Sequence, residues 1–301
     1  MDIQSKIILI SGPTASGKSN FALKLAKKFK GEIINADSMQ IYKELKILTA
    51  RPMKKDQRKI KHHLYGIQSA KKNFSTGSWF KNALKIIKKV EKKNKVPILV
   101  GGTGLYFKSL TEGIVKIPSI PLKLRNETRN LQKKIGQKKF YKILIKIDPL
   151  SKKIHFQDIQ RTIRAYEIIK FTKISIFQWF KKTRAPYQDN KFIKIYIDYP
   201  RAELIRRINS RVESMFKNGV VNEVKSFLKL KIKRENSVNK VIGIREISNY
   251  INNNSDLAQT KELIAIKTRQ YAKRQATWAR GQMNNWQKID PSQLKFLLKK
   301  I

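Results

Sequence analysis

Short apolar runs alternate with longer segments in which apolar residues recur every three or four positions. Four runs with almost no polar interruption cover residues 6–11, 32–35, 96–102 and 192–198. Between them, segments with helical spacing cover 19–29 and 78–93. Strands that are apolar on both faces and alternate with helices are typical of a parallel sheet covered on both sides. The pattern therefore predicts an α/β fold with a doubly wound parallel sheet.

This alternation is interrupted between residues 117 and 189. Pro118 and Pro121 mark the first boundary, and the segment "TRAPYQDN" (183–190) marks the second. Between them the spacing of apolar residues is helical. We therefore expect an all-helical insertion over 117–189 inside a core formed by 1–116 and 190–301. From Arg201 onward we expect only helices, over 201–217, 220–230, 244–252 and 256–282.

The first apolar run leads directly into a segment that matches the phosphate-loop pattern G-x-x-x-x-G-K-[ST]. A strand before this pattern and a helix after it predict a core like that of the P-loop NTPases. Backbone N–H groups and the helix N-terminus would hold an oxyanion, Lys18 would neutralise it, and Ser19 could ligate Mg²⁺. The motif is typical of proteins that bind ATP or another nucleotide, but it does not by itself identify the molecule that carries the phosphate. Its residues are Gly12, Pro13, Thr14, Ala15, Ser16, Gly17, Lys18 and Ser19.

Acidic residues are not where a nucleotide hydrolase would place them. Such an enzyme usually carries a carboxylate at the end of a second apolar strand, to manage Mg²⁺ and water. Here that strand is followed by Thr103, a small hydroxyl, and the carboxylate, Asp37, follows the run 32–35. Strand ends share one edge of a parallel sheet, so Asp37 should lie beside the phosphate loop. It suits a general base for an incoming nucleophile, or a helix cap or turn residue, and position alone does not decide.

The charge balance favours a polyanionic partner. The chain has 67 basic and 21 acidic residues, a net charge of +46, and nucleic acid is the first expectation. Lysine, isoleucine and asparagine are all abundant, which is typical of compositional bias, so the sign of the charge is more informative than its size. The absence of cysteine excludes disulfides and cysteine zinc fingers, and the three histidines are scattered. Without a long apolar run or a signal pattern, we expect a soluble intracellular protein.

Eight ordered segments resemble the tRNA dimethylallyltransferase family, from the phosphate loop to about Trp286. The resemblance implies a P-loop core with a helical insertion. It also implies transfer of a dimethylallyl group from dimethylallyl diphosphate to the exocyclic amine of the adenine just 3′ of the anticodon, in tRNAs reading codons that begin with U, by a cytoplasmic monomer. The segments are "GPTASGKS", "NADSMQIYK", "LTARP", "HHLYGI", "LVGGTGLYFKSL", "DIQRTIRAYEI", "IGIREI" and "TRQYAKRQATWARGQ".

By this resemblance the phosphate loop holds the pyrophosphate of dimethylallyl diphosphate, not ATP. Lys18, Arg211 and Mg²⁺ would stabilise the leaving group, and Asp37 would take the proton of the amine. Thr103 would lie against the reacting groups and the tRNA. The remaining positions implied to contact the tRNA anticodon stem-loop are Ser38, Met39 and Gln40 beside Asp37; Arg125; Gln160, Arg161, Thr162, Ile163 and Arg164; and Lys240, Val241, Ile242, Gly243, Ile244 and Arg245.

Two basic helix faces add to the candidates. Arg207 and Arg211 are four residues apart and share one face of the helix expected over 201–217, opposite an apolar stripe. We expect Arg207 to support Arg211. Near the C-terminus, a second stripe would be a solvated face on its own, but the resemblance favours contact with RNA backbone; Trp278 beside it is expected in the core. This second stripe comprises Arg269, Lys273, Thr277 and Arg280.

Two positions depart from the family pattern. Trp79 stands where members often have aspartate, and Lys240 stands where some have arginine. Three alternatives to the transferase remain. An ATP-dependent nucleoside or polynucleotide kinase would share the loop, the Mg²⁺ and paired arginines. A non-catalytic RNA-binding protein with a relic loop would not need the intact motif and Asp37. A prenyltransferase for free adenylate would not need the helical insertion.

Overall fold

The computed structural model describes residues 3–291 and 293, and the chain divides into two compact units. One unit is formed by Met1–Thr111 together with Tyr187–Ile301, and the other by Glu112–Pro186. The second unit occupies the segment for which the sequence predicts a helical insertion, with each boundary a few residues earlier.

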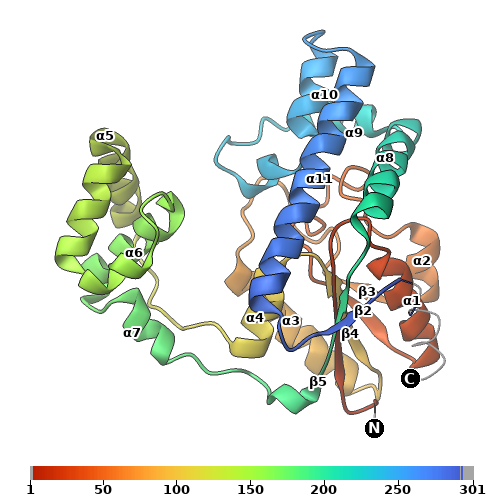
Figure 1. Ribbon diagram of the computed structural model, residues 1–301, viewed down its shortest axis with the longest axis horizontal. Coiled ribbons are helices and arrows are strands. Elements are labelled where there is room, and N and C mark those ends of the chain that lie inside the picture. Colours follow the sequence, from red (N-terminus) through yellow and green to blue (C-terminus); the bar gives the residue numbers. More distant parts are fainter. Residues whose placement is uncertain (1–2, 292, 294–301) are drawn as a thin grey trace. The chain divides into compact units, whose positions relative to one another are not determined.

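The first unit is built on a six-stranded sheet with the order β3-β2-β4-β1-β5-β6 (Figure 1). All five strand pairings are parallel, which confirms the predicted fold class. In register, Ile8 and Ile33 both pair with Ile98 of the central strand β4. The strands are β1 (Ile7–Ser11), β2 (Glu32–Asn35), β3 (His62–His63), β4 (Pro97–Gly101), β5 (Phe192–Ile197) and β6 (Gln287–Ile289).

Helices cover both faces of this sheet, which explains why its strands are apolar on both sides. Ile8 and Ile10 face one core cluster together with α1 (Lys18–Lys28). Ile7 and Leu9 face a second, larger cluster. That cluster includes residues of α3 (Thr76–Glu91), α4 (Gly104–Glu112), α8 (Arg201–Lys217), α9 (Val220–Leu228), α10 (Ile244–Ile251) and α11 (Leu257–Gln282). Alternate side chains of each strand are therefore buried in opposite directions.

Most predicted elements are found within two or three residues of their expected bounds, but two helices and two strands of the sheet unit were not predicted. The expectation of helices alone after Arg201 is wrong, because β6 follows α11 and pairs with β5. The strand β3, the short helix α2 (Lys54–Lys59) and the helix α4 were also missed. Strands of two or three residues at a sheet edge are too short to show a period in the sequence. Short 3₁₀ turns also occur as η2 (Asp189–Lys191) and η3 (Ser237–Lys240).

The second unit consists of helices around a core of its own. Its buried residues include Phe140, Leu144, Ala165 and Ile168. Gly136 has a φ of 78°, so α5 is two helical segments joined at a kink. The unit contains α5 (Leu122–Ile147), η1 (Pro149–Lys153), α6 (Ile159–Thr172) and α7 (Ile176–Lys181).

No helix in the described part of the chain has the length and hydrophobicity needed to cross a membrane.

Candidate active site

The phosphate loop lies between β1 and α1, at the carboxyl edge of the sheet. Gly17 has a φ of 85° at the N-cap of α1, a conformation that favours glycine. The Lys18 side chain folds back over the loop, and its Nζ donates to the Pro13 carbonyl at 2.9 Å. The buried Ser16 Oγ has no hydrogen-bond partner among the described residues, and Ser19 is exposed on the first helical turn. This arrangement of a helix N-terminus and a central lysine suits an oxyanion.

Two arginines of α8 reach the same loop. Arg211 Nη1 donates to Thr14 Oγ1 at 2.8 Å, and Arg207 Nε donates to the Ala15 carbonyl at 2.7 Å. The Arg207 guanidinium also lies 4.9 Å from the centre of the Tyr199 ring. The apolar stripe on the opposite side of α8 is buried, as the sequence predicts: Leu204, Ile208 and Val212.

The electrostatics of the loop favour a multiply charged anion. Burial lowers the pKa of Lys18 to about 8; the carboxylate of Asp37 opposes this shift, and Arg211 adds to it. Burial also lowers the pKa of Arg211, again against the effect of Asp37. Two desolvated cations with one carboxylate nearby leave excess positive charge that a phosphate group would neutralise. A hollow of about 350 Å³ beside the loop is lined by Ala15, Arg206, Arg207, Ser210 and Arg211.

Asp37 lies on the other side of the same sheet edge. The strand order β2-β4-β1 places Thr103, which follows β4, between Asp37 and the phosphate loop. Asp37 Oδ1 accepts a hydrogen bond from the Met39 N–H at 2.9 Å. Residues 36–53, all of which are described, contain no helix, so Asp37 is a turn residue and not a helix cap. Its role as a general base stays a prediction.

The loop after β4 holds the segment around Asp37 in place. Thr103 Oγ1 accepts from the Ser38 N–H at 2.9 Å and lies 3.3 Å from Ser38 Oγ. A Cβ at Gly101 would lie 2.1 Å from the backbone of Ala36, so only glycine permits this approach. The small residues after β4 therefore allow the two strand ends to come together.

Asn35 and Trp79, whose hydrogen bonds hold the backbone at Asp37 in place, were missed by the sequence analysis. The Asp37 N–H donates to Asn35 Oδ1 at 2.8 Å, and Asn35 Nδ2 donates to the Asp37 carbonyl at 2.9 Å. The buried Trp79 donates its indole N–H to the Asn35 carbonyl at 2.7 Å and stacks on Tyr106. Trp79 thus belongs to the support of the site. A polar Asn35 at the end of a buried strand was the available signal.

Three tyrosines share the surroundings of Asp37. Burial raises the pKa of Tyr65, Tyr106 and Tyr271, and the negative charge of Asp37 raises it further. All three phenols therefore stay neutral at physiological pH.

The positions implied to contact RNA in the core unit divide into exposed and buried side chains. Ser38, Met39 and Gln40 are half-buried, and Gln40 Nε2 donates to the Thr49 carbonyl at 2.8 Å. Further along the chain Lys240 and Arg245 are exposed, Ile242 is half-buried, and Val241 and Ile244 belong to the core. Gly243 is the N-cap of α10, with a φ of 106°. Direct contact with a ligand through side chains therefore falls mainly to the exposed members.

In the second unit the same division holds. Gln160 and Arg161 are exposed, whereas Thr162 is fully buried, and Ile163 packs against the core of the unit. Arg125 and Arg164 are brought together by the buried carboxylate of Glu167. The Glu167 carboxylate is 3.1 Å from Arg164 and 4.0 Å from Arg125. The structure thus joins two predicted RNA-contacting segments that are far apart in the sequence.

The basic stripe on α11 is largely exposed. Lys273, Thr277 and Arg280 are exposed, whereas Arg269 is ion-paired to Glu262 at 2.9 Å. Trp278 packs against the core as expected, and a Cβ at Gly104 would lie 2.2 Å from its ring.

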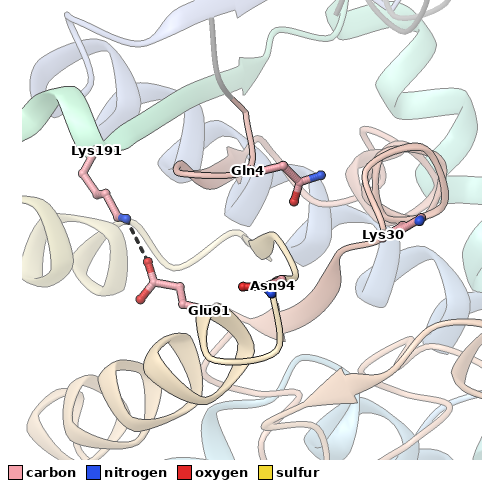
Figure 2. A pocket seen from close by; sticks show the side chains of 5 residues that line it. All are labelled: Gln4, Lys30, Glu91, Asn94 and Lys191. Atoms are coloured by element: carbon pink, nitrogen blue, oxygen red, sulfur yellow. Dashed lines mark ion pairs between the residues drawn. The ribbon is translucent and has the colours of Figure 1, made fainter.

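A larger hollow, of about 540 Å³, is shown in Figure 2, and none of the site residues described above lines it. Gln4, Lys30, Glu91, Asn94 and Lys191 line it, and Glu91 forms an ion pair with Lys191 at 3.0 Å. These residues precede the starts of β1, β2, β4 and β5, so the hollow is at the amino edge of the sheet. Ligands of open parallel sheets bind at the carboxyl edge, where the phosphate loop is. We therefore place the candidate active site there.

Comparisons with known proteins point to one family. The family model described as IPP transferase matches residues 40–282. The chain is 60% identical to the tRNA dimethylallyltransferase of Pelagibacter ubique (strain HTCC1062), over 100% of this chain and 96% of that protein. It is 38% identical to the tRNA dimethylallyltransferase of Ehrlichia chaffeensis, over 93% of this chain and 92% of that one.

Solved structures agree. The tRNA isopentenylpyrophosphate transferase from Bacillus halodurans superposes with a TM-score of 0.71 at 30% identity, covering 98% of this chain and 95% of that one. A eukaryotic dimethylallyltransferase, solved as snapshots of its action on tRNA, superposes with a TM-score of 0.83 at 28% identity. It covers 95% of this chain and 73% of that chain.

Proposed function

The chain belongs to the IPP transferase family, and on that premise we infer that it is a tRNA dimethylallyltransferase. The donor is dimethylallyl diphosphate. We propose as acceptor the exocyclic amine of the adenine just 3′ of the anticodon, in tRNAs reading codons that begin with U. The matches to transferases over nearly the whole chain do not favour the kinase alternative. Because its substrate is tRNA, we place the enzyme in the cytoplasm, and we propose that it acts as a monomer.

The observation that supports this function is the pairing of an anion loop with a carboxylate at one sheet edge. In the reaction, the amine nitrogen forms a bond to the allylic carbon while the carbon–oxygen bond to pyrophosphate breaks. Lys18 and Arg211 would stabilise the negative charge that develops on the leaving oxygen. Asp37 would accept the proton that the amine loses. Hydrolysis of a nucleotide would instead need a positioned water and a second acidic residue.

Mg²⁺ is proposed as the cofactor, with Ser19 as its protein ligand. Among the described residues, no group of three or more histidine, cysteine, aspartate or glutamate side chains could hold a metal ion. Mg²⁺ commonly binds through one or two protein oxygens together with substrate phosphates and water, so a single exposed hydroxyl beside a phosphate loop fits it. Bound there, Mg²⁺ would neutralise part of the pyrophosphate charge.

The tRNA would present its adenine outside the base stack. A stacked base cannot reach a loop at the sheet edge, and unstacking costs a few kcal/mol. Phosphate contacts from basic side chains can offset that energy, and the predicted RNA-contacting segments of both units offer exposed arginines and lysines. Arg161, whose side chain is 79% exposed, is the clearest of these in the second unit.

Binding of tRNA should weaken steeply with salt, and Arg161→Ala should make that dependence less steep. Loss of one phosphate contact reduces the slope of log K against log salt by about 0.7–0.9. The Arg161 guanidinium forms an ion pair with the half-buried Asp158 at 3.3 Å, and its own side chain is largely exposed, so its loss should cost little stability. The measurement is tRNA affinity at several salt concentrations, with Lys85→Ala on α3 as a control of equal charge change. An unchanged slope for Arg161→Ala would remove this residue from the interface.

The transfer itself is tested with purified protein, tRNA, dimethylallyl diphosphate and Mg²⁺. We expect mass spectrometry of the digested tRNA to show an added five-carbon unit on one adenosine, with pyrophosphate released in equal amount. ATP in place of the donor should give no modified nucleoside and no phosphorylated product. Phosphate transfer from ATP would support the kinase, and RNA binding without any product would support the non-catalytic alternative. Product with free adenylate but none with tRNA would support the adenylate prenyltransferase.

A further inference from the structure

Gln275, in the middle of α11, hydrogen-bonds to two loops of the active site. Its Oε1 accepts from the Thr14 N–H in the phosphate loop at 2.8 Å. Its Nε2 donates to the Gly102 carbonyl, in the loop after β4, at 2.9 Å. The Thr14 N–H can only donate and the Gly102 carbonyl can only accept, so the orientation of the amide is fixed by its partners. One half-buried side chain therefore joins two loops that are far apart in the sequence.

The space around this amide is tightly limited. A Cβ placed on Gly102 would lie 2.0 Å from Gln275 Nε2, closer than any real contact. A side chain at position 102 would therefore displace the Gln275 amide from its present position. A shorter amide would not reach both backbone groups at once. The length of glutamine sets the separation of the two loops.

Each loop carries one half of the proposed chemistry. Thr14, whose N–H is held by Gln275, also accepts a hydrogen bond from Arg211 through its hydroxyl. Gly102, on the other side, precedes Thr103, which holds the Ser38 N–H next to Asp37. The Gln275 amide thus stands between the leaving-group half of the site and the acceptor half.

We propose that Gln275 is a positioning residue, which fixes the spacing between the phosphate loop and the Thr103 loop and so aligns the attacking amine with the leaving pyrophosphate. The role is stated for the proposed dimethylallyl transfer. Substitution at carbon requires the nucleophile, the carbon and the leaving oxygen to be nearly in line. A misplacement of about 1 Å can slow such a step by about 10²-fold.

The test compares Gln275→Met, which keeps the length of the side chain and loses both hydrogen bonds, with Gln275→Asn, which keeps the amide but is too short. The control is Gln270→Met, at an exposed position of the same helix. We expect both Gln275 variants to lower the single-turnover rate at saturating substrates by about 10–100-fold, with tRNA affinity unchanged. The control should stay within about twofold of wild type, as expected of a surface substitution.

A double-mutant cycle separates positioning from general stability. If Gln275 acts through the Thr103 loop, the rate losses of Gln275→Met and Thr103→Val should combine to less than their product. Full multiplication of the two losses, or a Gln275→Asn rate equal to wild type, would overturn the proposal. Thermal unfolding of Gln275→Met and Gln275→Asn shows whether each variant folds. If one of them does not fold, the rate of the other is used for the test.

Failure of the proposed function would look different. Wild-type protein would then give no modified tRNA at all. Calorimetry would still measure the affinity of the phosphate loop for pyrophosphate. Gln275→Met should weaken that affinity by about 3–10-fold, because the loop loses one hydrogen bond. An active wild type with unaffected Gln275 variants would instead leave the function standing and remove only the positioning role.

Discussion

Asp37→Asn should lower the single-turnover rate of transfer by roughly 10²–10⁴-fold, the typical contribution of a general base. The amide oxygen of asparagine can still accept the Met39 N–H, which Asp37 Oδ1 accepts at 2.9 Å, so the turn should keep its shape. Only the basic group is lost. The affinity for tRNA should change little, because the amine gives its proton to Asp37 only after the tRNA has bound. The measurement is the rate of product formation after rapid mixing of enzyme, labelled donor and tRNA, with the enzyme in excess over the tRNA.

The control for this substitution is Asp189→Asn. Asp189 is an exposed carboxylate in η2 whose partner, Lys194, has a largely buried side chain. The amide oxygen of asparagine can still accept the hydrogen bond from Lys194, so the substitution should leave the rate unchanged. An Asp37→Asn enzyme that kept most of its single-turnover rate would show that another group takes the proton. Removing the carboxylate should also push the pKa of Lys18 further below 8, because Asp37 opposes the effect of burial there.

Lys18→Met should weaken the binding of dimethylallyl diphosphate by about 10²-fold while making the ligand-free protein more stable. The loss of affinity follows from removing a charge-assisted partner of the pyrophosphate. The gain in stability follows from the pKa of Lys18, which burial lowers from 10.5 to about 8. At pH 7, below this lowered pKa, Lys18 is still a charged ammonium in the folded protein, so the free-energy cost of burying that charge is fully present. Methionine removes that penalty, on the order of 1–3 kcal/mol.

The pH dependence has a definite sign. Between about pH 8 and 10.5 the folded protein binds fewer protons at Lys18 than the unfolded chain does. Stability contributed by this group therefore rises with pH through that window, and the penalty is fully present below about pH 8. Urea unfolding of wild type and Lys18→Met at several pH values should show two curves that converge as the pH rises. Parallel curves, or a destabilised variant at pH 7, would contradict this account of the buried lysine.

The core of the fold could be predicted because its strands are buried on both faces. Runs such as Glu32–Asn35 are continuous and bounded by polar turns, and α8 begins and ends at the predicted residues, Arg201 and Lys217. The phosphate loop could be identified because its chemistry is contained in eight consecutive residues. Local information of this kind is complete in the sequence.

Contacts between distant segments could not be predicted in the same way. The segment containing Gln275 was recognised as part of a motif, but its partner Gly102 is 173 positions away. The spacing of residues along one helix says nothing about which loop lies opposite. Thr162 shows the same limit, because a polar residue between two arginines gave no sign that its hydroxyl is buried and accepts from Gln137. Strands β3 and β6 exist only because a longer neighbour supplies their hydrogen bonds.

The helical unit of Glu112–Pro186 has a core that none of its buried residues shares with the sheet. Cooperativity in folding follows shared burial, so this unit and the sheet unit each have a free energy of unfolding of their own. A cavity made at Phe140 should lower the free energy of unfolding of the helical unit, and one made at Leu99 should lower that of the sheet unit. We therefore expect a temperature or a substitution that unfolds the helical unit to leave the phosphate loop and Asp37, which belong to the sheet unit, folded. We expect such a protein to bind diphosphate while lacking the RNA-contacting positions proposed for the helical unit, Arg125 and Arg161 among them.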